Sequence, residues 1–176
     1  MNWDDAQRYC RKHHTDLATI GNSKDIKQFL DIVSSTNDVW IGLYSNINWT
    51  WSGELNSVGS QYRNWESSDN DPDFISANQF CVCIGDNGGW WDYDCEKKFP
   101  FVCYNRTTEF VAVDEAMNWS NARTYCQQNF TDLATIRNIA ENQRVQTLVA
   151  TGYWAWTGLR RDENIYWSDQ SSFRFS

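Results

Sequence analysis

The side chains that most often carry out catalysis are scarce in this sequence, and their spacing matches no catalytic motif. The two histidines, His13 and His14, are adjacent, so on a helix they point in different directions. No histidine lies near a nucleophile motif, and Gly-rich phosphate loops, CxxC and HExxH are absent. Cys81 and Cys83 have strand spacing without a second cysteine pair, which disfavours zinc. We therefore predict a binding protein and not an enzyme.

Cysteines and glycosylation sequons together indicate the compartment. The chain has 6 Cys, an even number. Four Asn-x-Ser/Thr sequons lie at Asn48, Asn105, Asn118 and Asn129. Disulfides and N-glycans both form in the secretory pathway. We expect an extracellular protein, either secreted or the ectodomain of a membrane receptor.

Charge and composition exclude several classes of partner. The 176 residues include 15 Lys+Arg against 23 Asp+Glu, a net charge of −8, which argues against nucleic-acid binding and against a polybasic membrane surface. The 41% hydrophobic and 16% aromatic fractions are enough to build a core. No apolar run of about 20 residues predicts a membrane-spanning segment, and the polar, acidic N-terminus does not resemble a signal peptide.

An internal repeat decides the organisation of the chain. Four segments recur, and each copy lies 116 residues after the first, without insertion or deletion. The paired segments are 1–10 with 117–126, 15–20 with 131–136, 40–43 with 156–159, and 51–52 with 167–168. A period of this length corresponds to a whole domain. We predict a tandem pair: a domain over 1–105 that lacks its first strand, and the N-terminal part of a second domain over 106–176.

The elements of the first repeat begin with helices. Apolar residues at helical spacing predict a helix over 3–14, with Asn2 as its N-cap. A second helix is predicted over 23–34, capped by Asn22 or Ser23. In the second repeat, Asn138 is the expected cap of the corresponding helix.

Short aromatic and β-branched segments follow, and these predict strands. The predicted strands are 39–44, 49–52, 80–84 and 99–104, with a further one over 109–113. A long polar stretch separates Gly53 from Asn78, and loops of such length are usually functional. Two helices followed by a strand-rich half indicate an α+β fold.

The motifs of this sequence resemble those of the C-type lectin-like domain family, whose tandem members include receptors of the mannose-receptor type. The motifs are Trp3-x-x-Ala6-x-x-Tyr9-Cys10, Asp16-Leu17-Ala18-Thr19-Ile20, Trp40-Ile41-Gly42-Leu43, Trp51-Ser52-Gly53, Gly89-Trp90-x-Asp92 and Pro100-Phe101-Val102-Cys103. The resemblance implies two helices, small antiparallel sheets and a long loop. We expect the second copy to be truncated.

The resemblance also implies two disulfides. Cys10–Cys103 would connect the first helix to the last strand, and Cys81–Cys95 would close the loop before that strand. Cys126 is the repeat counterpart of Cys10, and its expected partner lies beyond Ser176. Cys83 has no expected partner, which leaves either a buried free thiol or a bond to Cys126 or to another chain.

In sugar-binding members of this family, one calcium ion bridges protein and sugar through oxygen ligands. The resemblance places the family's loop triplet at Asp71-Pro72-Asp73, with the proline in cis. The triplet lies two residues further from Trp65 than is usual, and it is neither the mannose-type nor the galactose-type sequence. Asp69 is an alternative ligand in the same loop.

The remaining ligand positions are partly altered. Gln79 stands where a Glu is expected, and Trp91-Asp92 stands where Asn-Asp is expected. A Gln carbonyl can coordinate calcium, whereas an indole offers only an N–H donor. The implied metal ligands are Asp71, Asp73, Gln79 and Asp92, and the implied carbohydrate-binding residues are the same four with Trp91. The alternative is an acidic solvated loop that binds no metal.

Two functions therefore remain. The first is an extracellular carbohydrate-recognition module of a tandem lectin-like protein, with calcium as cofactor and a glycan or glycoprotein as ligand. The second is a calcium-independent protein–protein recognition domain with a degenerate sugar site. Trp91, Tyr93 and Trp65 form a candidate aromatic contact surface. The other tryptophans expected in the core are Trp3, Trp40, Trp51 and Trp90.

The domain that lacks its first strand is expected to expose a sheet edge. The segment 110–113 is the candidate to fill that edge, in the same chain or by strand exchange between chains.

Overall fold

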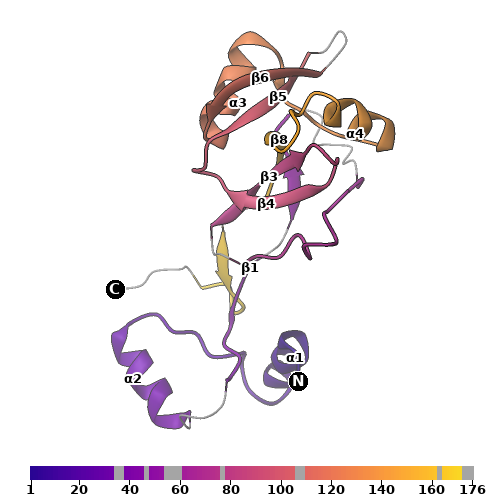
Figure 1. Cartoon of the computed structure of the whole chain (residues 1–176). Coiled ribbons are helices and arrows are strands. Elements are labelled where there is room, and N and C mark those ends of the chain that lie inside the picture. Colours follow the sequence, from indigo (N-terminus) through magenta and orange to yellow (C-terminus); the bar gives the residue numbers. More distant parts are fainter. Residues whose placement is uncertain are drawn as a thin grey trace. The chain divides into compact units, whose positions relative to one another are not determined.

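The computed structural model describes residues 1–33, 38–45, 48–53, 61–75, 78–105, 110–161 and 164–171. The chain forms two compact units (Figure 1). Unit 1 consists of Met1–Ile47 with Glu163–Ser176, and unit 2 consists of Asn48–Asp162. The predicted division into 1–105 and 106–176 follows the sequence repeat, whereas the compact units cross it. Unit 2 joins the C-terminal part of the first repeat to the N-terminal part of the second.

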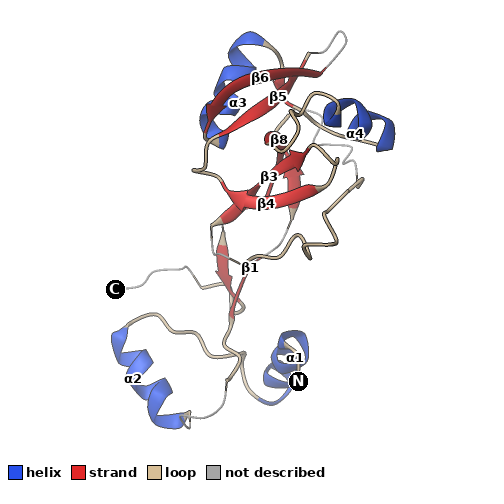
Figure 2. Cartoon of the chain, viewed as in Figure 1, coloured by secondary structure: helices blue, strands red, loops and turns tan. Residues whose placement is uncertain are grey.

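The helices of both repeats, drawn in blue in Figure 2, each begin after an asparagine N-cap. Asn2 and Asn22 accept backbone N–H groups at the starts of their helices, and Asn118 and Asn138 do the same in the second repeat. The helices are α1 (Trp3–His13), α2 (Ser23–Ile32), α3 (Trp119–Asn129) and α4 (Ile139–Gln146). Both helices predicted in the first repeat are therefore confirmed, with ends one to two residues earlier than expected.

Unit 2 is built on a seven-stranded sheet with the order β4-β3-β8-β5-β6, in which β2 also pairs with β8 and β7 with β5. Its strands are β2 (Trp49–Trp51), β3 (Gln79–Gly85), β4 (Trp90–Asp94), β5 (Phe99–Tyr104), β6 (Phe110–Met117), β7 (Asp132–Leu133) and β8 (Trp154–Arg161). The strands predicted over 49–52, 80–84 and 99–104 are confirmed. Strand β4 was not expected, because Gly88 and Gly89 before it and polar residues within it weaken the strand pattern.

Strand β6 confirms the expectation for segment 110–113. It pairs antiparallel with β5 in the same chain, with Phe110 opposite Tyr104 and Val113 opposite Phe101. The strand edge of the first repeat is therefore covered by the beginning of the second repeat.

The core of unit 2 combines residues of both repeats. Strand β8, from the second repeat, lies between β3 and β5, from the first. Trp90 and Val102 of the first repeat pack in one cluster with Ile136 and Leu159 of the second. A continuous buried run, Val82–Ile84, is typical of a strand covered on both faces. The buried cluster of unit 2 therefore depends on side chains from both repeats.

The disulfides confirm one predicted pair and correct the other. Cys81–Cys95 is present, with an S–S distance of 2.01 Å. The predicted Cys10–Cys103 bond is wrong, because Cys103 bonds to Cys126. Helix α3, and not its repeat counterpart α1, packs against β5, and this places Cys126 where Cys10 was expected. Cys10 and Cys83 are free thiols.

Unit 1 contains α1, α2 and a two-stranded antiparallel sheet of β1 (Leu43–Ser45) and β9 (Ile165–Trp167). Of the predicted strand 39–44, only its end is in a strand. The expected core position of Trp40 is wrong, because this side chain is 54% exposed. Trp3 is half-buried, whereas Trp51 and Trp90 of unit 2 are buried as expected. Across the described parts of the chain, none of the helices has the length and hydropathy needed to cross a membrane.

Candidate functional site

The loop that leads into β3 is held against β4 at its base. Trp65 forms a parallel bridge with Trp90, and Glu66 N–H donates to the Trp90 carbonyl at 2.9 Å. The peptide bond between Asp71 and Pro72 is cis, as the family resemblance implied. This anchoring brings the loop triplet to the side of the sheet where Asp92 lies.

Three of the predicted metal ligands converge. Each of Asp71, Asp73 and Asp92 offers a carboxylate oxygen, and these oxygens lie within 4.8 Å of one another. The backbone N–H of Asp73 donates to Asp92 Oδ1 at 3.0 Å, and the N–H of Asp92 donates to Asp71 Oδ1 at 3.2 Å. Backbone contacts between loop and strand therefore fix the three carboxylates as a group.

The carboxylate of Asp92 is the most deeply placed of the three. Asp92 is 1% exposed and lies on β4 opposite the buried Val82 of β3. Its Oδ2 atom is buried and has no hydrogen-bond partner among the described residues. Leaving a buried carboxylate oxygen unsatisfied costs about 1–3 kcal/mol or more. A cation at this point would supply the missing partner.

Electrostatic repulsion acts on the group as well. Burial first, and then the neighbouring carboxylates of Asp92 and Asp73, together raise the pKa of Asp71 to about 7. Burial, together with the charges of Asp71 and Asp92, raises the pKa of the Cys83 thiol. Cys83 is therefore a buried, neutral thiol, which is one of the two alternatives that the sequence left open.

Gln79 lies beside the carboxylates as predicted, but with its amide nitrogen toward them. Its Nε2 donates to Asp73 Oδ1 at 3.3 Å and to the Asp92 carbonyl at 3.1 Å. A half-turn of the terminal amide exchanges nitrogen and oxygen, which turns a carbonyl oxygen to the same place.

Trp91 contributes no ligand atom, as its chemistry requires. Its indole Nε1 donates to Asp69 Oδ2 at 3.2 Å. Asp69 is exposed and does not belong to the described carboxylate cluster, so the structure does not bring this alternative ligand to the site.

Sequence reasoning missed Arg161, a buried cation at the edge of the site. Its Nε donates to the Gln79 carbonyl at 2.9 Å, and its guanidinium lies 4.5 Å from the centre of the Phe80 ring. Burial lowers the pKa of Arg161, while the charge of Asp92 acts to raise it. Its repeat counterpart is Ser45, so the repeat held no signal for this contact.

The aromatic surface differs from the predicted one. Trp65 packs against the core, with its ring 4.9 Å from Trp49. The ring of Trp91 instead packs edge-on against the ring of Trp154 from the second repeat, with 6.1 Å between the ring centres. Tyr93 and Trp154 are exposed, and Phe99 lies between them, 5.3 Å from Tyr93 and 6.3 Å from Trp154. The surface therefore contains Trp91, Tyr93, Phe99 and Trp154.

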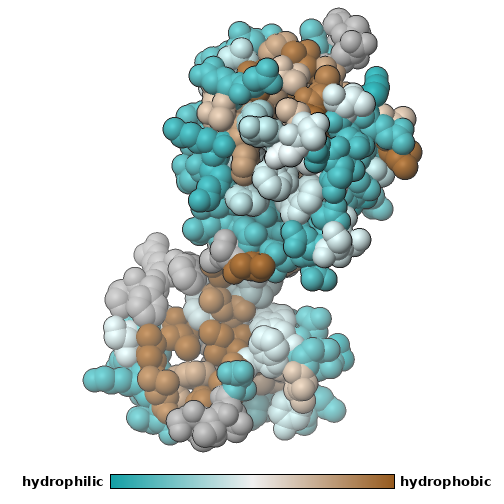
Figure 3. Space-filling view, viewed as in Figure 1, coloured by the Kyte–Doolittle hydropathy of each residue, from teal (hydrophilic) through white to brown (hydrophobic). Residues whose placement is uncertain are grey.

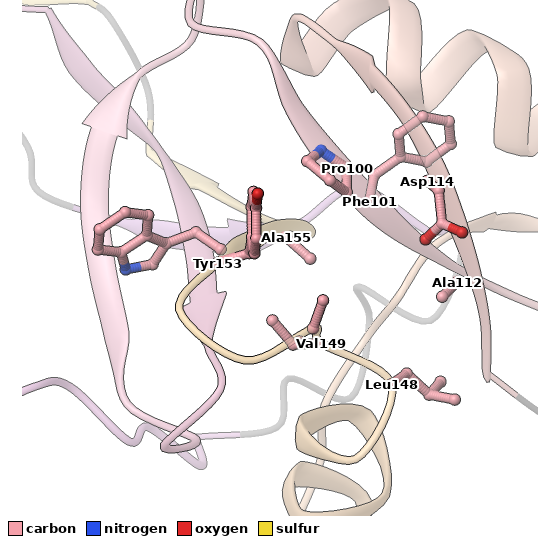
Figure 4. A pocket seen from close by; sticks show the side chains of 10 residues that line it. Pro100, Phe101, Ala112, Asp114, Leu148, Val149, Tyr153 and Ala155 are labelled. Atoms are coloured by element: carbon pink, nitrogen blue, oxygen red, sulfur yellow. The ribbon is translucent and has the colours of Figure 1, made fainter.

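A pocket lies beside this surface, between β5, β6 and the segment that follows α4 (Figure 4). Phe101, Asp114, Leu148 and Tyr153 are among its lining residues. Its volume is about 20 Å³, which suits a single water molecule and not a sugar ring.

The sequon asparagines lie at or near the surface. Asn48, Asn105 and Asn129 are exposed. Asn118 is half-buried: its side-chain oxygen caps α3, and its Nδ2 donates to Glu96 at 3.1 Å. Glycosylation at these positions stays a prediction, with Asn118 the least accessible of the four.

Comparison with known proteins agrees with these observations. The family model of the lectin C-type domain matches residues 1–105 and 115–176. Rat P-selectin is 31% identical over 115 residues, which are 61% of this chain and 15% of that protein. Rat L-selectin is 29% identical over 117 residues, which are 62% of this chain and 31% of that protein. The chain thus spans under a third of either selectin.

A shorter relative is covered more fully. The C-type lectin APL of Agkistrodon piscivorus piscivorus is 32% identical over 113 residues, which are 57% of this chain and 80% of that protein. No solved structure matches. The family consists of binding proteins, in agreement with the prediction that the chain is not an enzyme. The two matched segments, the α+β fold and the Cys81–Cys95 bond together lead to one conclusion: the chain belongs to the C-type lectin domain family.

Proposed function

We propose that unit 2 is an extracellular carbohydrate-recognition module that holds calcium through Asp71, Asp73 and Asp92. One observation carries this proposal: three carboxylates converge, and the buried Oδ2 of Asp92 has no partner among the described residues. Calcium takes oxygen ligands, and several carboxylates favour it over singly charged ions. Gln79 adds a further oxygen if its amide turns.

When bound, calcium would supply open coordination positions for the hydroxyl groups of a sugar. The chain's own residues perform the rest. Backbone N–H groups of Asp73 and Asp92 orient the carboxylates. Asp71, whose pKa is raised to about 7, would give up its proton when a divalent cation neutralises the cluster.

Trp91 and Arg161 support the alternative function, calcium-independent recognition of a protein. Trp91 occupies a ligand position of the family without an acceptor atom, and its indole is already bonded to Asp69. Arg161 places a positive charge close to Asp92 in the absence of any metal. The surface of Trp91, Tyr93, Phe99 and Trp154 would then form the contact, because exposed aromatic side chains are typical of protein interfaces.

Binding to a glycan array in calcium and in EDTA separates the two functions. The first predicts binding that EDTA abolishes and that Asp92→Asn removes, while Glu115→Gln, an exposed acid on β6 outside the cluster, leaves it unchanged. The absence of glycan binding in both buffers would instead support the protein-recognition function, in which Trp154→Ala should weaken the contact with the protein partner. Binding unaffected by Asp92→Asn would reject the proposed calcium site.

A further inference from the structure

Four aromatic side chains of unit 2 form a continuous surface that the calcium site does not use. We call Trp91, Tyr93, Phe99 and Trp154 the aromatic surface. Tyr93 is 38% exposed and Trp154 is 41% exposed, and the other two are half-buried. Each ring packs against another ring of the set. On the visible surface over β4, side chains of intermediate hydropathy, such as tryptophan and tyrosine have, gather among strongly hydrophilic ones (Figure 3).

The rings are tilted against one another, and this tilt favours a cation over a sugar chain as the ligand. The interplanar angle is 86° between Trp91 and Trp154, 79° between Tyr93 and Phe99, and 52° between Phe99 and Trp154. A chain of sugar rings stacks best on aromatic rings that share one plane, and these rings do not share one. Ring faces that point in several directions suit cations, because the negative face of each ring attracts positive charge.

Three exposed carboxylates lie beside the aromatic surface, and we call them the acidic rim. Asp69 Oδ2 accepts a hydrogen bond from Trp91 Nε1 at 3.2 Å. Asp86 Oδ2 accepts a backbone N–H from the segment between α4 and β8 at 2.8 Å. Asp114 lines the same pocket as Trp154 (Figure 4). None of the three carboxylates forms an ion pair with another described residue, so their charge is available to a partner.

The charge of the chain selects a basic partner for this surface. A second copy is opposed, because each chain has a net charge of −8. Lys97 and Lys98 lie in the turn before Phe99, so a basic partner has to approach from the elements that carry the acidic rim. Arginine suits the surface better than lysine, because a planar guanidinium stacks on an aromatic ring while its N–H groups donate to carboxylates.

We propose that the aromatic surface binds an arginine-rich segment of another protein. Guanidinium groups of that segment stack on the exposed rings, and their N–H groups donate to the carboxylates of the acidic rim. The proposal deepens the protein-recognition function described above, on which it rests, and it does not depend on calcium.

A fluorescein-labelled peptide of alternating arginine and glycine tests the proposal by fluorescence polarisation with the full chain in EDTA. The matched control is the same peptide with citrulline, which keeps the planar shape of arginine without its charge. We expect the arginine peptide to bind about tenfold tighter than the citrulline peptide. Its binding should weaken severalfold between about 50 mM and about 500 mM salt, because salt screens exposed charges. Equal binding of the two peptides, or binding of neither, would overturn the proposal.

Two pairs of matched variants locate the contact. Tyr93→Ala removes a ring from the aromatic surface, whereas Tyr166→Ala removes a ring of nearly equal exposure, 37%, from β9 of unit 1. Tyr93→Ala should weaken binding of the arginine peptide about tenfold, and Tyr166→Ala should leave it unchanged. Asp114→Asn should weaken it about threefold, and Glu115→Gln, the adjacent exposed acid on β6, should not. Equal effects within either pair would contradict the assigned contact.

Asp92→Asn distinguishes this proposal from the calcium site. It should leave binding of the arginine peptide unchanged, because Asp92 is 1% exposed and lies outside the acidic rim. The same substitution should remove calcium-dependent binding to a glycan. Loss of peptide binding in Asp92→Asn would mean that the peptide occupies the carboxylate cluster, and this result would overturn the proposal.

A measurement on the unaltered chain does not depend on how well any variant folds. An arginine peptide with a central photoreactive benzoylphenylalanine is irradiated with the full chain in EDTA, and mass spectrometry maps the cross-links. We expect them within residues 91–99 and 153–154. Cross-links confined to unit 1, or displacement of the peptide by a chitin or glucan oligosaccharide, would overturn the proposal.

Discussion

Trp156 and Trp40 occupy the same position in the two repeats, and alanine at each position tests whether the units cross the repeat boundary. Trp156 is fully buried between β3 and β5, so Trp156→Ala should destabilise unit 2 by about 3–5 kcal/mol. Trp40 keeps 54% of its surface exposed, so less than half of that burial is lost in Trp40→Ala, and we expect a cost of about 2 kcal/mol or less in unit 1.

The hydrogen bonds of the two indoles do not affect the comparison. Trp156 donates to the Met117 carbonyl at 3.0 Å, and Trp40 donates to the Met1 carbonyl at 2.9 Å. Each substitution therefore removes one equivalent bond, and the difference reflects burial alone. Trp154→Ala, beside Trp156 but exposed, controls for the loss of any tryptophan from β8.

Hydrogen exchange measured by mass spectrometry reports each unit separately. Trp156→Ala should lower the protection of segment 78–105 by about two to four orders of magnitude, and Trp40→Ala should leave that segment unchanged. If Trp40→Ala exposed segment 78–105 while Trp156→Ala did not, this segment would pack on the first repeat, and the assignment of the units would be refuted.

Further predictions concern pH and disulfides. In EDTA, the raised pKa of Asp71 means that the folded state holds more protons than the unfolded state between pH 4 and 7. Unfolding free energy should therefore fall as pH rises through this range, and Asp71→Asn should flatten the decline in a denaturant titration. Calcium should flatten it also, because bound cation favours the ionised carboxylate. Cys126→Ser should cost unit 2 about 3 kcal/mol, since that bond closes a loop of 23 residues, whereas Cys10→Ser should change either unit's thermal midpoint little.

Local patterns in the sequence predicted most elements, and the family resemblance implied the disulfide between Cys81 and Cys95. Asparagine caps, helical spacing and aromatic strand segments are set by neighbours a few residues away, and they were correct at α1, α2, β3 and β5. Local patterns do not determine which N-terminal half, residues 1–52 or residues 117–168, packs with the C-terminal half of the first repeat. Two first halves that share the same motif residues compete for one second half within the described residues, and both contain the same cysteine, tryptophan and leucine.

The same distinction applies to the candidate site, where residues of the first repeat were predicted and a residue of the second repeat was not. The resemblance identified Asp71, Asp73 and Asp92, which the structure brings together. Arg161 escaped prediction because it comes from the other repeat and enters through β8. The exposure of Trp40 also escaped prediction. Strand β3, which was expected to pack beside Trp40, pairs with its repeat counterpart Trp156 in unit 2.

The most direct test of the proposed calcium site is the thermal midpoint of the full chain in calcium and in EDTA, compared with Asp92→Asn. At a calcium concentration a hundred times the dissociation constant, binding stabilises the folded state by about 2.7 kcal/mol, which raises the midpoint of unit 2 by several degrees. The account predicts this rise in the unaltered chain and its loss in Asp92→Asn. Identical midpoints for the unaltered chain in millimolar calcium and in EDTA would contradict the account and leave protein recognition as the function of unit 2.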